Sequence, residues 1–201
     1  MPSIICYGDS NTWGYEPQGL FGGRYPEALR WTGVLEDNGF EVINEGLCGR
    51  MIPIDPLLMK AMAKTMNSYK APDIFLIMLG GNNILHEEIS PAQIADKMDN
   101  FLDNLTRIKW YDPAKTLLAT PAKLEEGSWV YEQEMIDKSL ALPAFYKQLA
   151  EKHGMHFVDT TGWKIDKVFD GVHYSPKGHK AFGENMYEYI KKEFGIGAEE
   201  K

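Results

Sequence analysis

The sequence predicts an α/β fold in which a parallel β-sheet is covered by helices on both faces. Five short apolar segments rich in β-branched and aromatic residues recur along the chain, and segments with helical spacing lie between them. No internal repeat or low-complexity linker breaks this alternation. Strands that alternate with helices form parallel sheets with both faces covered. The expected strands are residues 3–8, 40–46, 73–81, 116–120 and 156–161.

The expected strands differ in the length of their apolar runs, which indicates how deeply each is buried. The first reads SIICYG and meets the polar residues GDSN at once, so it ends at the start of a turn. Residues 74–79 of the third read IFLIML, an unbroken apolar run that is typical of a central strand. We therefore place the third strand in the interior of the sheet.

Two of the expected helices carry clear start signals. Ser90 suits an N-cap and Pro91 a first turn, and Ser175 and Pro176 repeat the pattern near the C-terminus. Apolar residues then recur at spacings of three and four, which predicts a buried helix face. They are Ile94, Met98, Phe101, Leu102, Leu105 and Ile108 in the first helix, and Phe182, Met186 and Ile190 in the second.

Length and composition narrow the class of protein. The 201 residues fit a single domain spanning 1–201, and the 44% hydrophobic and 25% charged residues are those of an ordinary globular protein. A net charge of −8 argues against nucleic acid, which is bound by clustered Lys and Arg. The first apolar run is too short for a signal peptide or a membrane span. We expect a cytoplasmic protein that acts on a small molecule without a membrane partner; a homo-oligomer is compatible with these data.

Cysteines and histidines do not indicate a metal site or a cofactor. Two cysteines are too few for a disulfide framework, so we interpret Cys6 as a core residue and Cys48 as a free thiol. The HEEI segment at His86 lacks the second histidine of a zinc-protease motif. We expect no metal and no cofactor.

Residues suited to serine hydrolysis follow the expected strands. Ser10 comes after the first strand, and Asp170 and His173 come after the fifth. In a parallel sheet the strand ends meet at one edge, where sites form. A serine hydroxyl needs a base, which His173 can supply, and a nearby carboxylate fixes the tautomer of that base. Asp170 is three residues from His173; Asp159 is an alternative carboxylate without a histidine at that spacing.

Donors for an oxyanion and walls for a substrate also follow the strands. The backbone N–H groups of Ser10 and Gly46 and the side-chain amide of Asn82 are the candidate donors. We expect the neighbouring Asn83 to bond the loop backbone and Asp9 to accept from loop N–H groups. The expected substrate-binding residues are Trp13, Tyr15 and Trp129, whose alternative role is packing of their own loops.

Four segments in this order, GDSNTWG, NEGLCG, LGGNN and DGVH, resemble the four blocks of the SGNH or GDSL hydrolases. RYPEALRWTGVLE and IMLGGNN are similar to the bacterial arylesterase and acyltransferase branch, and the resemblance runs from residue 4 to about 190. It implies a three-layer α/β/α, flavodoxin-like fold with a five-stranded parallel sheet in the order 2-1-3-4-5. It also implies Ser10, Asp170 and His173 as the triad, and Ser10, Gly46 and Asn82 as the oxyanion hole.

The chain departs from the family pattern at several positions. Asn11 stands where Leu is usual, Gly81 and Asn83 stand in a block that usually reads GTND, and Cys48 stands where many relatives have Ser. Since Asn82 is kept, the resemblance still implies catalysis; the support around the oxyanion hole and the choice of substrate are what these changes affect.

Three functions are compatible with these residues. The first is a serine esterase that hydrolyses small carboxylic esters through an acyl-Ser10 intermediate, with acyl transfer to an alcohol as a second outcome. The second is a deacetylase of acetylated sugars that uses the same triad. The third is a non-catalytic flavodoxin-like protein that binds FMN or a phosphorylated ligand at GDSNTWG, but this function does not explain DGVH.

Overall fold

The computed structural model describes residues 1–21 and 23–196. In this part of the chain five parallel strands form one sheet in the order β2-β1-β3-β4-β5. The predicted strands and their order are therefore confirmed, with β3 at the centre, although β3 and β5 end before the last residues expected of them, at Met78 and Val158. The strands are β1 (Ser3–Gly8), β2 (Glu41–Gly46), β3 (Ile74–Met78), β4 (Thr116–Ala119) and β5 (His156–Val158).

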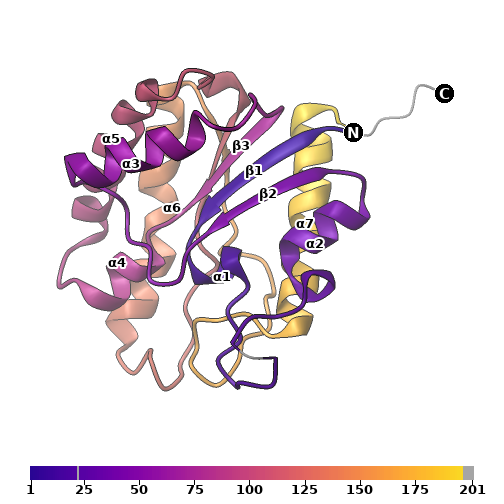
Figure 1. The fold of residues 1–201 in the computed structure, drawn as a ribbon. Coiled ribbons are helices and arrows are strands. Elements are labelled where there is room, and N and C mark those ends of the chain that lie inside the picture. Colours follow the sequence, from indigo (N-terminus) through magenta and orange to yellow (C-terminus); the bar gives the residue numbers. More distant parts are fainter. Residues whose placement is uncertain (22, 197–201) are drawn as a thin grey trace.

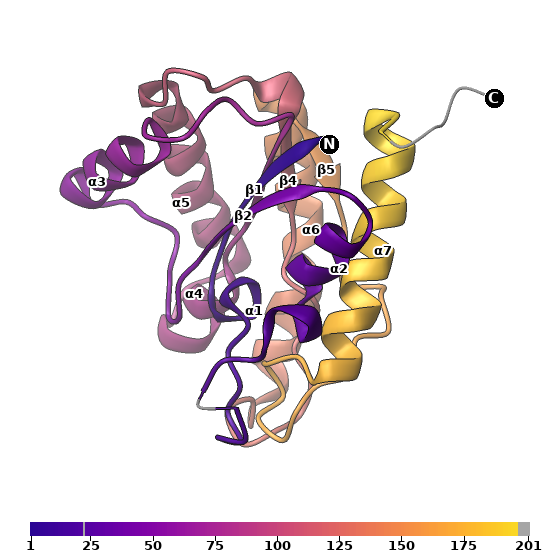
Figure 2. The same ribbon diagram turned by 45° about the vertical axis from the view of Figure 1, so that its right-hand side comes forward.

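Helices cover the sheet on both faces, as Figures 1 and 2 show. Helices α2 and α7 lie on one face, and α3, α5 and α6 lie on the other, which gives the predicted three layers. The short helices α1 and α4 lie at the edge where the strands end (Figure 1). The helices are α1 (Ser10–Trp13), α2 (Trp31–Asp37), α3 (Pro56–Met66), α4 (Gly81–His86), α5 (Pro91–Asp103), α6 (Gln133–His153) and α7 (Pro176–Phe194).

Alternating residues of each strand supply two separate cores. Ile4 and Cys6 of β1 pack with α2 and α7, whereas Ile5 and Tyr7 pack with α3, α5 and α6. The strand period of two produces this division, since neighbouring side chains point to opposite faces. Buried Cys6 is a core residue, as predicted.

The helix starts follow the predicted signals. Ser90 and Gln93 form a capping box at the start of α5, and the Ser175 hydroxyl accepts a hydrogen bond from Gly178 N at the start of α7. The end of α5 differs from the expectation, because the helix stops at Asp103 and a 3₁₀ turn continues over Asn104–Arg107. There the Asn104 amide and the Thr106 hydroxyl bond preceding carbonyls, which competes with regular helix bonding.

Among residues 1–21 and 23–196, no helix combines the length and the apolar character that crossing a membrane would require.

The contact between α2 and α7 generates a stability prediction. A Cβ atom added at Gly183 of α7 would lie 2.6 Å from Val34 Cβ and 2.8 Å from the Trp31 carbonyl oxygen of α2. We expect Gly183→Ala to lower the free energy of unfolding by about 1–3 kcal/mol because it forces the two helices apart. Urea denaturation measures this change.

Gly162→Ala is the control, because an added Cβ there meets nothing within 4 Å. It should change stability by less than about 1 kcal/mol. Equal stability of the two variants would show that α7 is free to shift away from α2.

Candidate active site

Ser10 lies where β1 turns into α1. Asp9 is the N-cap of α1, and its carboxylate accepts a hydrogen bond of 3.0 Å from Asn11 N. An added Cβ at Gly8 would lie 2.1 Å from Thr12 Oγ1, so the turn requires glycine there. This tight turn places Ser10 at the carboxyl edge of the sheet.

His173 reaches Ser10 from the loop after β5. Ser10 Oγ lies 2.9 Å from His173 Nε2, and His173 Nδ1 lies 2.7 Å from Asp170 Oδ2. All three side chains are buried. The structure therefore brings the three residues together in a continuous chain of hydrogen bonds.

The Asp170 carboxylate also organises its own loop. Its Oδ1 accepts from Val172 N at 2.8 Å and from His173 N at 2.9 Å. Burial raises the pKa of this carboxyl, but the hydrogen bonds from the His173 ring and from the two backbone N–H groups outweigh it and lower the pKa overall. The carboxylate thus stays ionised beside the imidazole.

Two other carboxylates near the strand ends take different positions. Asp159 accepts from the backbone N and the hydroxyl of Thr161, at 2.9 and 2.6 Å, rather than from a histidine. Asp9 caps α1, as expected of a structural acceptor. Burial raises the pKa of Asp9 to about 6, against the lowering effects of the Asn11 N–H and of nearby His173 and Arg50.

A cleft of about 310 Å³ opens over these residues. The rings of Tyr15 and Trp129 meet the His173 ring at centroid distances of 4.8 and 5.2 Å. Trp129 is 45% exposed and forms part of the rim. Both residues lie where the sequence predicts a substrate wall, whereas Trp13 packs under the Arg24 guanidinium and does not line the cleft.

The predicted backbone donor Gly46 does not face the cleft. Its N–H donates to Asn44 Oδ1 at 2.9 Å, and an added Cβ would lie 2.1 Å from Trp13 N. Gly49, with a φ of +72°, lines the cleft together with Cys48. Strand β2 ends at Gly46, in register with Gly8, as the sequence predicts, so Gly46 belongs to the strand and Gly49 to the loop that follows. The segment NEGLCG holds both glycines, and the hydrogen bond from Gly46 N–H to Asn44 is visible only in the folded chain.

Asn82 and Asn83 point in different directions from α4. Asn82 lines the cleft, and its amide donates to the Arg50 carbonyl at 3.1 Å. Asn83 accepts from Ile52 N at 3.1 Å, which confirms the prediction that it bonds the loop backbone. Its amide also donates to Glu87. The pair thus divides into one residue at the cleft and one that braces the loop.

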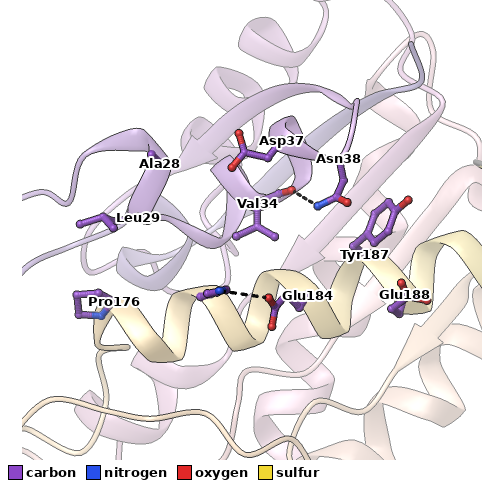
Figure 3. A pocket seen from close by; sticks show the side chains of 10 residues that line it. Ala28, Leu29, Val34, Asp37, Asn38, Pro176, Glu184, Tyr187 and Glu188 are labelled. Atoms are coloured by element: carbon purple, nitrogen blue, oxygen red, sulfur yellow. Dashed lines mark hydrogen bonds and ion pairs between the residues drawn. The ribbon is translucent and has the colours of Figure 1, made fainter.

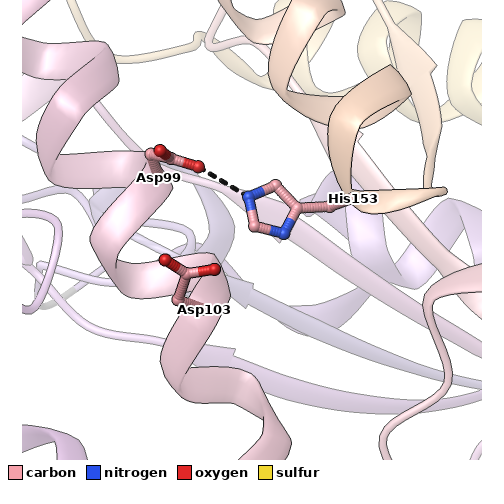
Figure 4. A group of neighbouring side chains, drawn as sticks. All are labelled: Asp99, Asp103 and His153. Carbon is pink, nitrogen blue, oxygen red and sulfur yellow. Dashed lines mark hydrogen bonds and ion pairs between the residues drawn. The ribbon is translucent and has the colours of Figure 1, made fainter.

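One cluster in the described residues has the composition of a metal site, formed by Asp99, Asp103 and His153 (Figure 4). It lies between α5 and α6, away from the cleft. Both Asp99 oxygens accept from Lys152 Nζ, at 2.8 and 2.6 Å, and one lies 2.6 Å from His153 Nε2. The Asp99 carboxylate is therefore already bonded by Lys152 and His153.

A larger hollow of about 670 Å³ lies between α2 and α7 (Figure 3). Two local contacts lie here: the Asn38 amide donates to the Val34 carbonyl, and Lys180 pairs with Glu184 at 3.8 Å. The residues that line this hollow include no serine, cysteine or histidine. The chemistry is concentrated in the smaller cleft.

Comparisons with known proteins identify a matching family and similar structures. Residues 6–181 match the GDSL-like lipase/acylhydrolase family. A carbohydrate acetylesterase family member from Sinorhizobium meliloti is similar in structure, with a TM-score of 0.79, 25% identity, and 98% and 100% of the two chains covered. The native aryl esterase of M. smegmatis is similar with a TM-score of 0.79, 26% identity, and 96% and 99% coverage.

A search among curated proteins returned no match. Since the family match covers most of the chain and the similar structures include esterases, the protein belongs to the GDSL-like lipase/acylhydrolase family of SGNH hydrolases and is a carboxylic ester hydrolase.

Proposed function

We propose that the protein hydrolyses small carboxylic esters through an acyl group carried on Ser10. The observation that supports this most strongly is the buried chain of contacts from Ser10 Oγ to His173 Nε2, at 2.9 Å, and from His173 Nδ1 to Asp170 Oδ2, at 2.7 Å. A ligand-binding protein without hydrolysis would have no use for this chain of groups.

Attack on the ester begins with a proton transfer. His173 Nε2 accepts the proton of Ser10 while Oγ bonds to the carbonyl carbon. Asp170 accepts from Nδ1–H, holds the tautomer and stabilises the imidazolium that forms. This carboxylate also opposes the positive end of α7, which begins at Pro176 and disfavours a charged imidazole.

The oxyanion then needs fixed donors at the cleft. The backbone N–H groups of Ser10 and Gly49 and the amide of Asn82 are the candidates, with Gly49 in place of Gly46 because Gly46 N–H is already bonded to Asn44. An amide has two N–H groups, so Asn82 can bond the Arg50 carbonyl with one and the oxyanion with the other. The contact with Arg50 orients the amide before substrate arrives.

Collapse of the tetrahedral species releases the alcohol. His173 returns the proton to the leaving oxygen, so the alcohol part lies next to His173, where Tyr15 and Trp129 pack. Water activated by His173 then cleaves the acyl-Ser10 ester. An alcohol that takes the place of this water yields a new ester, which is acyl transfer.

A second substrate class, acetylated sugars, is favoured by the surface beside the cleft. A polar hollow of about 940 Å³ shares Leu85 and His86 with the cleft. Its carboxylates are strong acceptors for sugar hydroxyls, and one structural relative is described as a carbohydrate acetylesterase family member. The carboxylates that line this polar hollow are Glu87, Glu88, Glu132, Glu134 and Asp137.

Relative activity on acetylated sugars and on aryl acetates distinguishes the two substrate classes.

The first prediction concerns the nucleophile. A fluorophosphonate should label Ser10 once per chain and abolish ester hydrolysis, because an activated serine attacks phosphorus readily. Intact mass and peptide mapping locate the label, and EDTA should leave the activity unchanged. Labelling of a different serine, or full activity of Ser10→Ala, would contradict the proposal.

The second prediction concerns the hydrogen-bonded pair. His173→Ala should be nearly inactive, and Asp170→Asn should fold but lose kcat by up to about 10⁴-fold, because the wrong tautomer then faces Ser10. Asp159→Asn is the matched control, since within residues 1–21 and 23–196 Asp159 accepts hydrogen bonds only from Thr161. A larger loss in Asp159→Asn than in Asp170→Asn would transfer the orienting role to Asp159.

The third prediction separates the two adjacent amides. Asn82→Ala should lower kcat by roughly 10²–10³-fold with little change in KM, because the donor acts mainly on the charged tetrahedral state. Asn83→Ala should instead lower the melting temperature, since it removes the contact with Ile52 N. The idea fails if Asn83→Ala has the larger loss of kcat at unchanged stability.

A further inference from the structure

Asn11, the residue after Ser10, bonds both chain neighbours of His173. Its amide nitrogen donates to the Val172 carbonyl at 3.2 Å, and its amide oxygen accepts from Tyr174 N at 3.0 Å. These two bonds lie on either side of His173. A single side chain therefore holds the loop that carries the base.

Asn11 is itself firmly held by its backbone. Its N–H donates to Asp9 Oδ1 at 3.0 Å, and its carbonyl accepts from Trp31 Nε1 at 3.1 Å. Trp31 is fully buried and packs edge-on against Phe182 of α7, at a centroid distance of 5.3 Å. The side chain of Asn11 thus extends from a fixed point in the core.

Other bonds fix the His173 loop, but to different parts of the chain. Glu125 N donates to the Gly171 carbonyl, and Trp129 N donates to the Asp170 carbonyl, so these bonds join the loop to the segment after β4. Across the described residues, the hydrogen bonds that join α1 to residues 170–175 are the Ser10–His173 contact and the two bonds of Asn11. Apart from the reacting pair, the link depends on Asn11.

The contacts of Asn11 require both a donor and an acceptor. Asparagine supplies an NH₂ group and a carbonyl oxygen, whereas leucine has neither and aspartate has no donor when ionised. The leucine that is usual at this position in the family could fill the space but could not make this link. The asparagine in GDSN therefore makes possible the link between α1 and the loop that carries His173.

We propose that Asn11 is a positioning residue that sets the separation of Ser10 Oγ and His173 Nε2. The inference rests on the proposed function, in which that separation governs proton transfer. Small misplacement of reacting groups has large effects, on the order of 10²-fold for 1 Å. Loss of the link should therefore reduce the rate of attack by Ser10 more than the binding of substrate.

Asn67 provides a matched control elsewhere in the chain. Its amide oxygen accepts from Lys109 N at 2.7 Å, and its amide nitrogen donates to the Arg107 carbonyl at 3.2 Å. These bonds flank Ile108 in the same way that those of Asn11 flank His173. Asn67→Leu thus removes the same pair of bonds far from the cleft.

The experiment compares Asn11→Leu with Asn67→Leu below the melting temperature of both. For Asn11→Leu we expect a fall in kcat of roughly 10–100-fold with KM within about twofold. The rate of fluorophosphonate labelling at Ser10 should fall in parallel, because it reports on activation of the serine without ester binding. Asn67→Leu should lose stability but keep kcat and the labelling rate within about twofold.

The outcomes separate this inference from the proposed function. If Asn11→Leu changes only the melting temperature while kcat and labelling match the wild type, Asn11 is structural and the inference is overturned. If Asn11→Leu does not fold, Asn11→Ala and Asn11→Asp are measured against the same expectation. Absence of ester hydrolysis and of Ser10 labelling in the wild type would instead overturn the proposed function.

Discussion

The contact between Ser10 Oγ and His173 Nε2 is the constraint on which the rest of the site depends. It spans 163 residues of sequence, so the chain must hold two distant loops at hydrogen-bond distance. The sheet accomplishes most of this, because parallel strands end at a common edge. Turns, helix caps and the two bonds of Asn11 then restrict the movement of the two loops, so that Ser10 Oγ and His173 Nε2 stay within hydrogen-bond distance.

Burial of the Asp170 and His173 side chains strengthens the hydrogen bond between them. With Asp170 fully buried and bonded by its own loop, the carboxylate stays ionised and fixes the imidazole, at a site where water competes weakly. Another buried histidine, His179, illustrates the opposite environment. Burial lowers its pKa to about 3, with nearby His173 and Arg30 acting in the same direction, and its Nδ1 accepts from Trp31 N. Of these two histidines, His173 bonds the Asp170 carboxylate, whereas His179 bonds a backbone N–H.

The strand patterns predicted the sheet, and the residues that follow the strands predicted the meeting of Ser10, Asp170 and His173. The strand order came from the resemblance to the SGNH hydrolases. The sequence pointed to Gly46 rather than Gly49 as a backbone donor, because the bond from Gly46 N to Asn44 Oδ1 cannot be read from the sequence. Trp13 was expected at the substrate and instead packs under Arg24, a contact set by the path of the loop. The sequence marked Asn11 as unusual, but its partners at Val172 and Tyr174 become visible only in the folded chain.

The central claim is that the acyl group of the substrate resides on Ser10 during turnover. Rapid acid quench of the enzyme with p-nitrophenyl acetate, followed by peptide mapping, tests it most directly. We expect one acetyl group on the peptide that contains Ser10, formed with a burst of p-nitrophenolate and absent from Ser10→Ala. An acetyl group on a different residue, formed at the rate of turnover, would contradict it.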